Sequence, residues 1–158
     1  MKKMLSLALV SAIMLSLAAC GQKAPQKQID GDLADIMAKV YENSGLAVAD
    51  EISLIEGELT DDNVESYLGT KDVEFTESLI SEPMISASPH LVVLLRVKDG
   101  TDVDGAVADI KEHANPQRWI CVGVDPSDVK VESAGNLVLL VMAEDSEKYA
   151  EAFQGLAK

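Results

Sequence analysis

Leu91-Val92-Val93-Leu94-Leu95-Arg96-Val97 decides the fold, because six of these seven residues are apolar. A strand with one face in water alternates apolar and polar residues, so this run predicts a strand that is covered on both faces. The segment Leu137–Ala143 has the same character. We therefore expect two buried strands in a sheet, with helices packed against it.

Weaker strand signals surround these two runs. Val129 and Val131 alternate with polar residues and lead into Ala134-Gly135-Asn136, which predicts a hairpin with Leu137–Ala143 as its buried second arm. The other predicted strands are residues 73–80 and a short segment at residues 52–55.

Amphipathic helices lie between the predicted strands. In the first, apolar residues recur at helical spacing from Leu33 to Tyr41, after Asp30 or Asp32 as the N-cap, and Asn43-Ser44-Gly45 ends it. Three more helices are predicted: a brief one that ends at Gly69, one that is capped by Thr101 or Asp102 and is stopped or kinked at Pro116, and a closing one that begins at Asp145 or Ser146. The order of elements predicts an α+β fold, a mixed β-sheet of four or five strands packed with about three helices, in a single domain over residues 30–158.

The first twenty residues have the order of a secretory signal. Met1-Lys2-Lys3 is basic, residues 5–19 are apolar, and Leu17-Ala18-Ala19-Cys20 resembles the lipobox of bacterial lipoproteins. A membrane-spanning helix needs about 20 apolar residues, so a permanent span is disfavoured. We expect residues 1–19 to be a cleaved lipoprotein signal peptide. Residues 20–29 would then be a lipidated Cys20 followed by a flexible tether, and Cys20 would carry diacylglycerol and an acyl chain such as palmitate. The alternative is an ordinary signal that ends in a cysteine by chance.

Composition and charge narrow the classes of function. Of the 158 residues, 47% are hydrophobic and 25% are charged, which excludes wholesale disorder and a polytopic membrane protein. The formal charge is -14, and cleavage before Cys20 removes two lysines, which leaves -16. Phosphate would repel such a chain, so we expect no nucleic-acid partner.

Few residues are candidates for catalysis. Cys121 is the only cysteine besides Cys20, so no disulfide can form within the lipidated chain, and the apolar stretch Trp119-Ile120-Cys121-Val122 predicts a buried structural thiol. His90 and His113 are the only histidines and lack metal-ligand spacing. Either could be a ligand or a base, and His113 could pair with Cys121, but we expect no catalytic residue.

Asp99-Gly100-Thr101-Asp102-Val103-Asp104-Gly105 is the segment most like a metal site. Two aspartates two residues apart before a glycine resemble part of a calcium loop, but Lys111 stands where a bidentate Glu belongs. Acids at a helix start are also explained by capping and by the helix dipole. We predict no metal and no cofactor, although Asp99, Asp102 and Asp104 could bind a cation in the alternative function.

Several short motifs resemble a known family. They are the lipobox, Tyr67-Leu68-Gly69, the strand His90–Val97 followed by Lys98-Asp99, Gln117 near the end of the middle helix, and Gly135-Asn136 before the last strand. From Asp32 to Leu156 the chain resembles a family of small Gram-positive lipoproteins known as domain of unknown function 4358. The resemblance implies an extracytoplasmic location on a single-membrane cell, and it brings no activity, ligand or catalytic residue.

The sequence therefore predicts a lipoprotein on the extracytoplasmic face of the cell membrane. We expect a non-catalytic binding or interaction module, attached to the membrane through Cys20, with an envelope protein or a small ligand as its partner. The alternative is an acidic metal- or solute-binding lipoprotein that delivers to a transporter. An enzyme that uses Cys121 or a histidine is the least favoured class.

Overall fold

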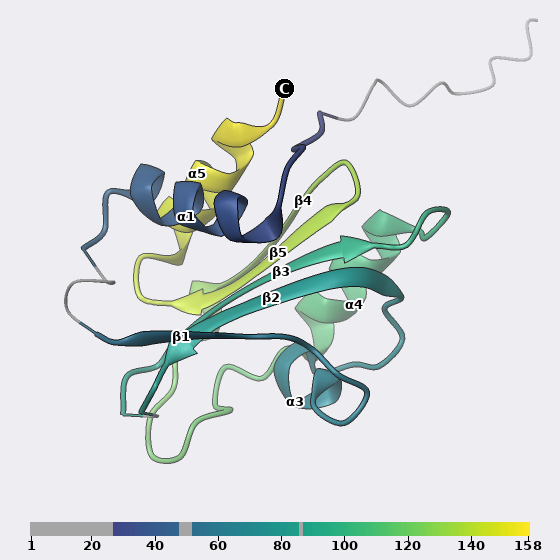
Figure 1. The fold of residues 1–158 in the computed structure, drawn as a ribbon. Helices are drawn as coiled ribbons and strands as arrows, with labels where there is room; N and C mark the ends of the chain where they lie inside the picture. The colour runs from purple at the N-terminus through teal and green to yellow at the C-terminus, as the bar shows by residue number, and fades with distance from the viewer. Residues whose placement is uncertain (1–26, 48–51, 86) are drawn as a thin grey trace, which may run out of the picture.

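The computed structural model describes residues 27–47, 52–85 and 87–158. In this part of the chain a five-stranded sheet lies between two layers of helices (Figure 1). Helices α1 (Leu33–Ser44) and α5 (Ser146–Leu156) cover one face, and α3 (Val64–Leu68) and α4 (Val103–His113) lie on the other. The predicted α+β class, with a sheet of five strands, is confirmed.

The sheet is antiparallel throughout. Its strand order is β1-β2-β3-β5-β4, and every neighbouring pair runs antiparallel. The bounds are β1 Leu54–Gly57, β2 Phe75–Pro83, β3 His90–Val97, β4 Val129–Ala134 and β5 Leu137–Ala143. The expected mixture of parallel and antiparallel pairs is therefore corrected. An unbroken apolar run predicts that both faces of the strand are covered, but it does not predict the direction of the neighbouring strand.

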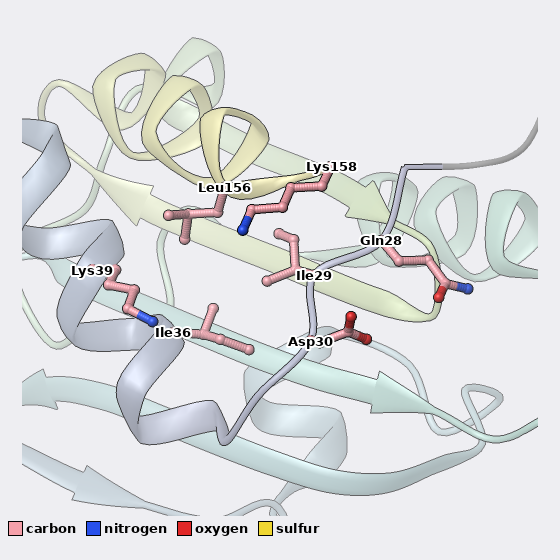
Figure 2. Close-up of a pocket in the computed structure, with 7 residues that line it drawn as sticks. All are labelled: Gln28, Ile29, Asp30, Ile36, Lys39, Leu156 and Lys158. Atoms are coloured by element: carbon pink, nitrogen blue, oxygen red, sulfur yellow. The ribbon is translucent and has the colours of Figure 1, made fainter.

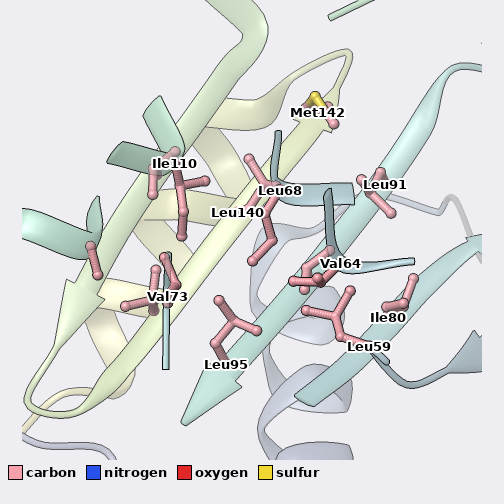
Figure 3. Close-up of a cluster of buried hydrophobic side chains, with 14 of the residues drawn as sticks. Leu59, Val64, Leu68, Val73, Ile80, Leu91, Leu95, Ile110, Leu140 and Met142 are labelled. Atoms are coloured by element: carbon pink, nitrogen blue, oxygen red, sulfur yellow. The ribbon is translucent and has the colours of Figure 1, made fainter. Parts of the chain in front are cut away.

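The two apolar runs lie side by side in the sheet and supply two separate cores. All of β5, and all of β3 except Arg96, is buried, which confirms that both strands are covered on both faces. Successive side chains of a strand point to opposite faces, so alternate residues enter different clusters. The cluster beside α3 and α4 (Figure 3) includes Leu68, Leu91, Leu95, Ile110, Leu140 and Met142. The cluster beside α1 and α5 includes Ile36, Val40, Val92, Leu94, Leu139, Val141 and Phe153.

The ends of α1 and α5 lie where the sequence predicts them. The Ala34 backbone N–H donates to the Asp32 side chain at 2.9 Å, and Gly45 ends α1 in the left-handed conformation, with a φ of 67°. Helix α5 begins directly after Asp145, which follows β5 by one residue. Helices α1 and α5 pack against each other on one face of the sheet.

Helices α3 and α4 meet at Gly69. This glycine ends α3 with a φ of 77°, as expected for the brief helix. A Cβ atom at this position would collide with the backbone carbonyl of His113, at the end of α4. Glycine is therefore required at this position for two reasons, its left-handed backbone conformation and the close approach of the two helices.

The two ends of the described chain also meet. The backbone N–H groups of Gln28 and Lys158 each donate to the other residue's carbonyl, at 3.2 and 3.1 Å, and Ile29 is buried in the core beside α1. The packed domain thus includes Gln28 and Ile29, which the sequence analysis assigns to the tether. The predicted signal peptide, Cys20 and the first part of the tether lie outside the described residues. Within the described residues, no helix has the length and apolar character needed to cross a membrane.

Candidate functional site

The acidic turn after β3 has the structure of a helix start. Asp102 is the N-cap residue of α4, and Asp104 lies in its first turn, where carboxylates complement the helix dipole. In the described ranges, no group of three or more His, Cys, Asp or Glu side chains is arranged to hold a metal ion. The geometry of Asp99, Asp102 and Asp104 therefore gives the cation-binding alternative no support.

His90 lies in a buried polar cluster between α1, α5 and the sheet. The Tyr41 hydroxyl donates to Ser81 Oγ at 2.9 Å and lies 2.8 Å from His90 Nε2. The Tyr149 ring packs edge-on against both rings, with centroid distances of 5.5 Å to Tyr41 and 5.7 Å to His90. His90 is only 5% exposed, and burial lowers the pKa of its imidazole to about 4. A base must come within hydrogen-bond reach of its substrate, so this enclosed ring is a packing element.

Two hydroxyls at the edge of this cluster are unsatisfied. Tyr149 Oη and Ser146 Oγ are buried and have no hydrogen-bond partner in the part of the chain that the structure describes. Burial also raises the pKa of the Tyr149 phenol to about 12. A buried hydroxyl without a hydrogen-bond partner lowers the free energy of unfolding by about 1 to 3 kcal/mol. Tyr149 differs in this respect from Tyr41, whose hydroxyl has two partners.

His113 and Cys121 occupy different settings. His113 lies at the end of α4, where a hydrogen bond to the Asp109 carbonyl raises the pKa of its imidazole. The same ring nitrogen lies 3.2 Å from the Asp109 carboxylate, one turn earlier in the helix. No hydrogen bond joins His113 to Cys121 among the described residues, so the dyad gains no geometric support.

Cys121 is exposed, so the prediction of a buried structural thiol is wrong. Its backbone is left-handed, with a φ of 73°, and it lies in the loop after α4. Within the apolar stretch only part of the sequence packs inward. Trp119 contacts the core beside α4, whereas Ile120 is 80% exposed. The apolar residues next to Cys121 in the sequence therefore do not predict whether its thiol is buried.

Arg118 joins this loop to β2 and α3. Its Nη1 lies 3.2 Å from Glu82 Oε2, and its Nε donates to the Ser66 carbonyl at 3.3 Å. The guanidinium stacks over the Tyr67 ring, 4.2 Å from the centroid, and lies 5.4 Å from the Trp119 centroid. The Tyr67 hydroxyl donates to the same Glu82 carboxylate at 2.6 Å, and burial together with this bond raises the pKa of the phenol. We call Tyr67, Glu82, Arg118 and Trp119 the Arg118 cluster.

The Arg118 cluster holds the loop of residues 116–124 in place. The side chains of Arg118 and Glu82 are only 14% and 23% exposed, so water screens their ion pair less than a pair on the open surface. At the base of the loop, the Val124 N–H donates to the Pro116 carbonyl at 3.0 Å. These contacts therefore hold both ends of the loop in place, and Ile120 lies at its tip.

Large apolar side chains are exposed on segments at or next to this cluster. The large ones in the described residues are Ile55 (42% exposed), Met84 (66%), Ile85 (68%) and Ile120 (80%), and we call these four the apolar end surface. Ile55 pairs across the sheet with Glu82, Met84 and Ile85 follow the end of β2, and Ile120 is close in sequence to Arg118. A hollow of about 250 Å³ belongs to the same surface and is lined by Ile52, Ser53, Pro83, Met84, Ile85 and Ser88.

Sequence analysis did not identify this site. Its central ion pair joins residues 36 positions apart, and no motif links Glu82 to Arg118. The only available signal was the apolar pair Trp119-Ile120 between Pro116 and Gly123, because proline and glycine mark a loop and a loop cannot bury every side chain.

A second candidate site is a pocket beside the chain ends. Its volume is about 330 Å³, and it is lined by Gln28, Ile29, Asp30, Ile36, Lys39, Leu156 and Lys158 (Figure 2). Ile29 and Ile36 are buried and form an apolar floor. Lys39 and Lys158 reach into the rim, and neither forms an ion pair with another described residue. Asp30 also lines this pocket, so two cationic side chains and one anionic side chain surround an apolar floor.

Comparisons with known proteins do not extend this picture. No family model matches the chain, and neither the curated proteins nor the solved structures contain a significant match. The resemblance to the Gram-positive lipoprotein family therefore stays a prediction, and the argument for function depends on the geometry.

Proposed function

We propose that this protein is a lipid-anchored interaction module that binds an envelope protein through the apolar end surface and performs no catalysis. Cys20 is its anchor, and the domain lies on the extracytoplasmic side of the cell membrane. One observation carries the proposal: large apolar side chains are exposed on β1, after the end of β2 and in the loop of Arg118, which are the segments at or next to the Arg118 cluster. Large exposed apolar side chains at one end of a globular domain are typical of a binding surface.

The residue types of this surface favour a protein partner. Binding energy at protein interfaces is concentrated in Trp, Tyr and Arg, with aliphatic residues around them. Arg118, Tyr67 and Trp119 provide these types, and Ile120 and Met84 provide exposed aliphatic area. Because Arg118 already holds the loop in place, binding does not need to order it, and this reduces the entropic cost of association.

The position of the surface also favours a protein over lipid. Figure 1 shows the loops after β2 and after α4 at the opposite end of the domain from the chain terminus, where Gln28 pairs with Lys158. Three of the 13 basic residues precede residue 27, whereas all 27 acidic residues follow it, so the domain carries a formal charge of -17. Anionic lipids repel such a charge, and the tether would hold the apolar end surface away from the membrane.

Cys121 provides a chemical handle beside this surface. Purified lipidated protein is labelled at Cys121 with a benzophenone maleimide, mixed with detergent-solubilised envelopes and irradiated. We expect one predominant cross-linked envelope protein, which mass spectrometry identifies. Because Ile120 and Met84 are among the most exposed apolar side chains, Ile120→Asp and Met84→Asp should each reduce the adduct by about tenfold or more, the loss of one well-packed contact.

A matched control separates contact from charge. Ala108 is exposed on α4, so Ala108→Asp adds the same charge outside the apolar end surface and should leave the adduct unchanged. Equal adduct in all three variants would refute the proposed surface. A turnover measured on an envelope substrate, and abolished by one point mutation, would refute the non-catalytic role.

The pocket of Figure 2 favours a second candidate function, the capture of a small anionic solute for a transporter. Octanoate combines a carboxylate for Lys39 and Lys158 with an alkyl chain for the floor at Ile29 and Ile36. Calorimetric titration should then give saturable heat that Lys39→Gln weakens. Titrations without heat would remove this candidate and would leave the interaction module untouched.

A further inference from the structure

Strand β1 forms one edge of the sheet, and no other strand of the described residues pairs with its outer side. It is last in the strand order, and three of its four residues are exposed. The Met84 N–H donates to the Ser53 carbonyl at 3.0 Å, which identifies this pair as hydrogen-bonded in an antiparallel ladder. Hydrogen-bonded and non-hydrogen-bonded pairs alternate, so the backbone groups of Leu54 and Glu56 point away from β2. Pro83, which has no N–H, lies opposite Leu54 and agrees with this register.

The opposite edge of the sheet is better protected. The Gln154 side chain in α5 donates to the Ser133 carbonyl of β4 at 3.2 Å. Lys130 of β4 also forms an ion pair with Glu147 of α5, so a helix side chain lies along this strand. Natural sheets cover or charge their edges to prevent pairing with other chains. Among the described residues, β1 is thus the edge with backbone groups available to another chain.

The side chains of β1 specify what a neighbouring strand should carry. Ile55 lies opposite Glu82, on the face of the Arg118 cluster, whereas Glu56 lies on the other face, where its charge acts on Tyr41. Between Ile52 and Asn63 the chain has four acidic residues, Glu56, Glu58, Asp61 and Asp62, and no Lys or Arg. Directly opposite residues interact most strongly, so a complementary strand alternates apolar residues beside Ile55 with basic residues beside Glu56.

We propose that β1 binds an extended, basic and apolar segment of an envelope protein as a sixth strand of the sheet. This inference rests on the proposed function and names the partner's chemistry. The backbone of the segment pairs with Leu54 and Glu56, and its apolar residues extend the apolar end surface at Ile55. A second copy of this chain is disfavoured, because pairing β1 with itself would place Glu56 and Glu58 near their like charges.

The hollow next to β1 supports the same partner. Ile52 and Ser53, which lead into β1, form one wall, and Met84 and Ile85 form another. A strand added along β1 extends past this hollow, which can receive an apolar side chain. Backbone pairing then contributes affinity, and the hollow together with the acids contributes specificity.

The test uses the mature lipidated protein in detergent micelles and the peptide acetyl-Lys-Ile-Lys-Val-Lys-Ile-Lys-amide. We expect saturable binding, measured by fluorescence anisotropy, that weakens as salt rises. Amide hydrogen exchange followed by NMR reports the geometry. The amides of Leu54 and Glu56 should exchange about tenfold more slowly with peptide, whereas the Ile55 amide, already paired with β2, should change little.

Two substitutions of one residue separate backbone pairing from charge. Both substitutions remove the carboxylate of Glu56. Glu56→Pro also removes the outward N–H without removing a bond to β2, whereas Glu56→Ala keeps this N–H. We expect both variants to bind more weakly than the natural chain, with Glu56→Pro about tenfold weaker than Glu56→Ala, the equivalent of one hydrogen bond. Unchanged far-UV circular dichroism shows that each variant is folded.

The outcomes are distinct. Binding without protection of Leu54 and Glu56, equal affinity of the two variants, or no binding of this peptide overturns the strand-addition proposal. Protection of the same amides in the free protein, together with a dimer in sedimentation, identifies a second copy as the occupant and also overturns it. Cross-linking from Cys121 that depends on Ile120 but not on Glu56→Pro would leave the interaction module standing and remove only the inference about β1.

Discussion

Tyr41 is partly buried and packs against the buried Tyr149. Changing either residue to phenylalanine removes one hydroxyl oxygen, but the expected effects on stability are opposite. The Tyr41 hydroxyl contacts Ser81 and His90 at 2.9 and 2.8 Å. One such bond contributes about 0.5 to 1.5 kcal/mol, and both partners would stay buried, so Tyr41→Phe should lower the free energy of unfolding by about 2 to 3 kcal/mol. The Tyr149 hydroxyl has no partner in the described ranges. Tyr149→Phe removes a group that is costly to bury and should raise the free energy of unfolding by about 1 kcal/mol.

Urea unfolding of a chain that begins at residue 21 measures both effects. Far-UV circular dichroism and the fluorescence of the single tryptophan, Trp119, should report one coincident transition. Because both rings remain, the slope of free energy against urea should be the same in both variants, and only the midpoints should move. If both variants move the midpoint in the same direction by similar amounts, the hydrogen-bond argument for this cluster is wrong.

Three further predictions concern a glycine, a histidine and the anchor. Gly69→Ala should destabilise the domain by about 3 kcal/mol or more in thermal unfolding, because it adds a collision with His113 to the strain of a left-handed alanine. Gly45→Ala is the control: its Cβ would meet nothing within 4 Å, so it should cost only about 1 kcal/mol of stability. Equal losses of stability in the two variants would contradict the close approach of α3 and α4. The pKa of His90 is lowered from 6.5 to about 4, so the unfolded chain binds more protons between these values and stability falls as the pH drops through this window. The loss reaches about 3 kcal/mol, and it should vanish in His90→Gln and persist in His113→Gln, as measured by urea unfolding at several pH values. Cys20→Ser should leave the domain folded and release it from membranes, and a variant that stays in the membrane pellet would show that the uncleaved signal is the anchor.

The central elements could be predicted because their signals are local. The run Leu91–Val97 has no polar face, and Gly45 and Gly69 end helices by their own backbone preference, so the structure agrees there. Strand direction is not local. Whether β3 runs parallel to its neighbours depends on how the connections pack, and the side chains of one strand do not encode it.

The Arg118 cluster could not be predicted for a related reason. Arg118, Glu82 and Tyr67 come from three elements, and only the folded sheet brings them together. Cys121 shows the same limit in reverse, since its apolar neighbours suggested burial while a left-handed turn placed it in solvent. Contacts between distant segments and single backbone reversals are both set by tertiary structure.

The central sheet separates the two hydrophobic cores of the domain. The core beside α1 and α5 includes Ile29, next to the paired chain ends, whereas the core beside α3 and α4 supports Trp119 and the loop around it. Changes in side chains far apart on opposite sides of such a wall combine additively in their effect on stability. Under the proposed function, the residues of the apolar end surface can therefore change without loosening the half of the domain that contains the paired chain ends.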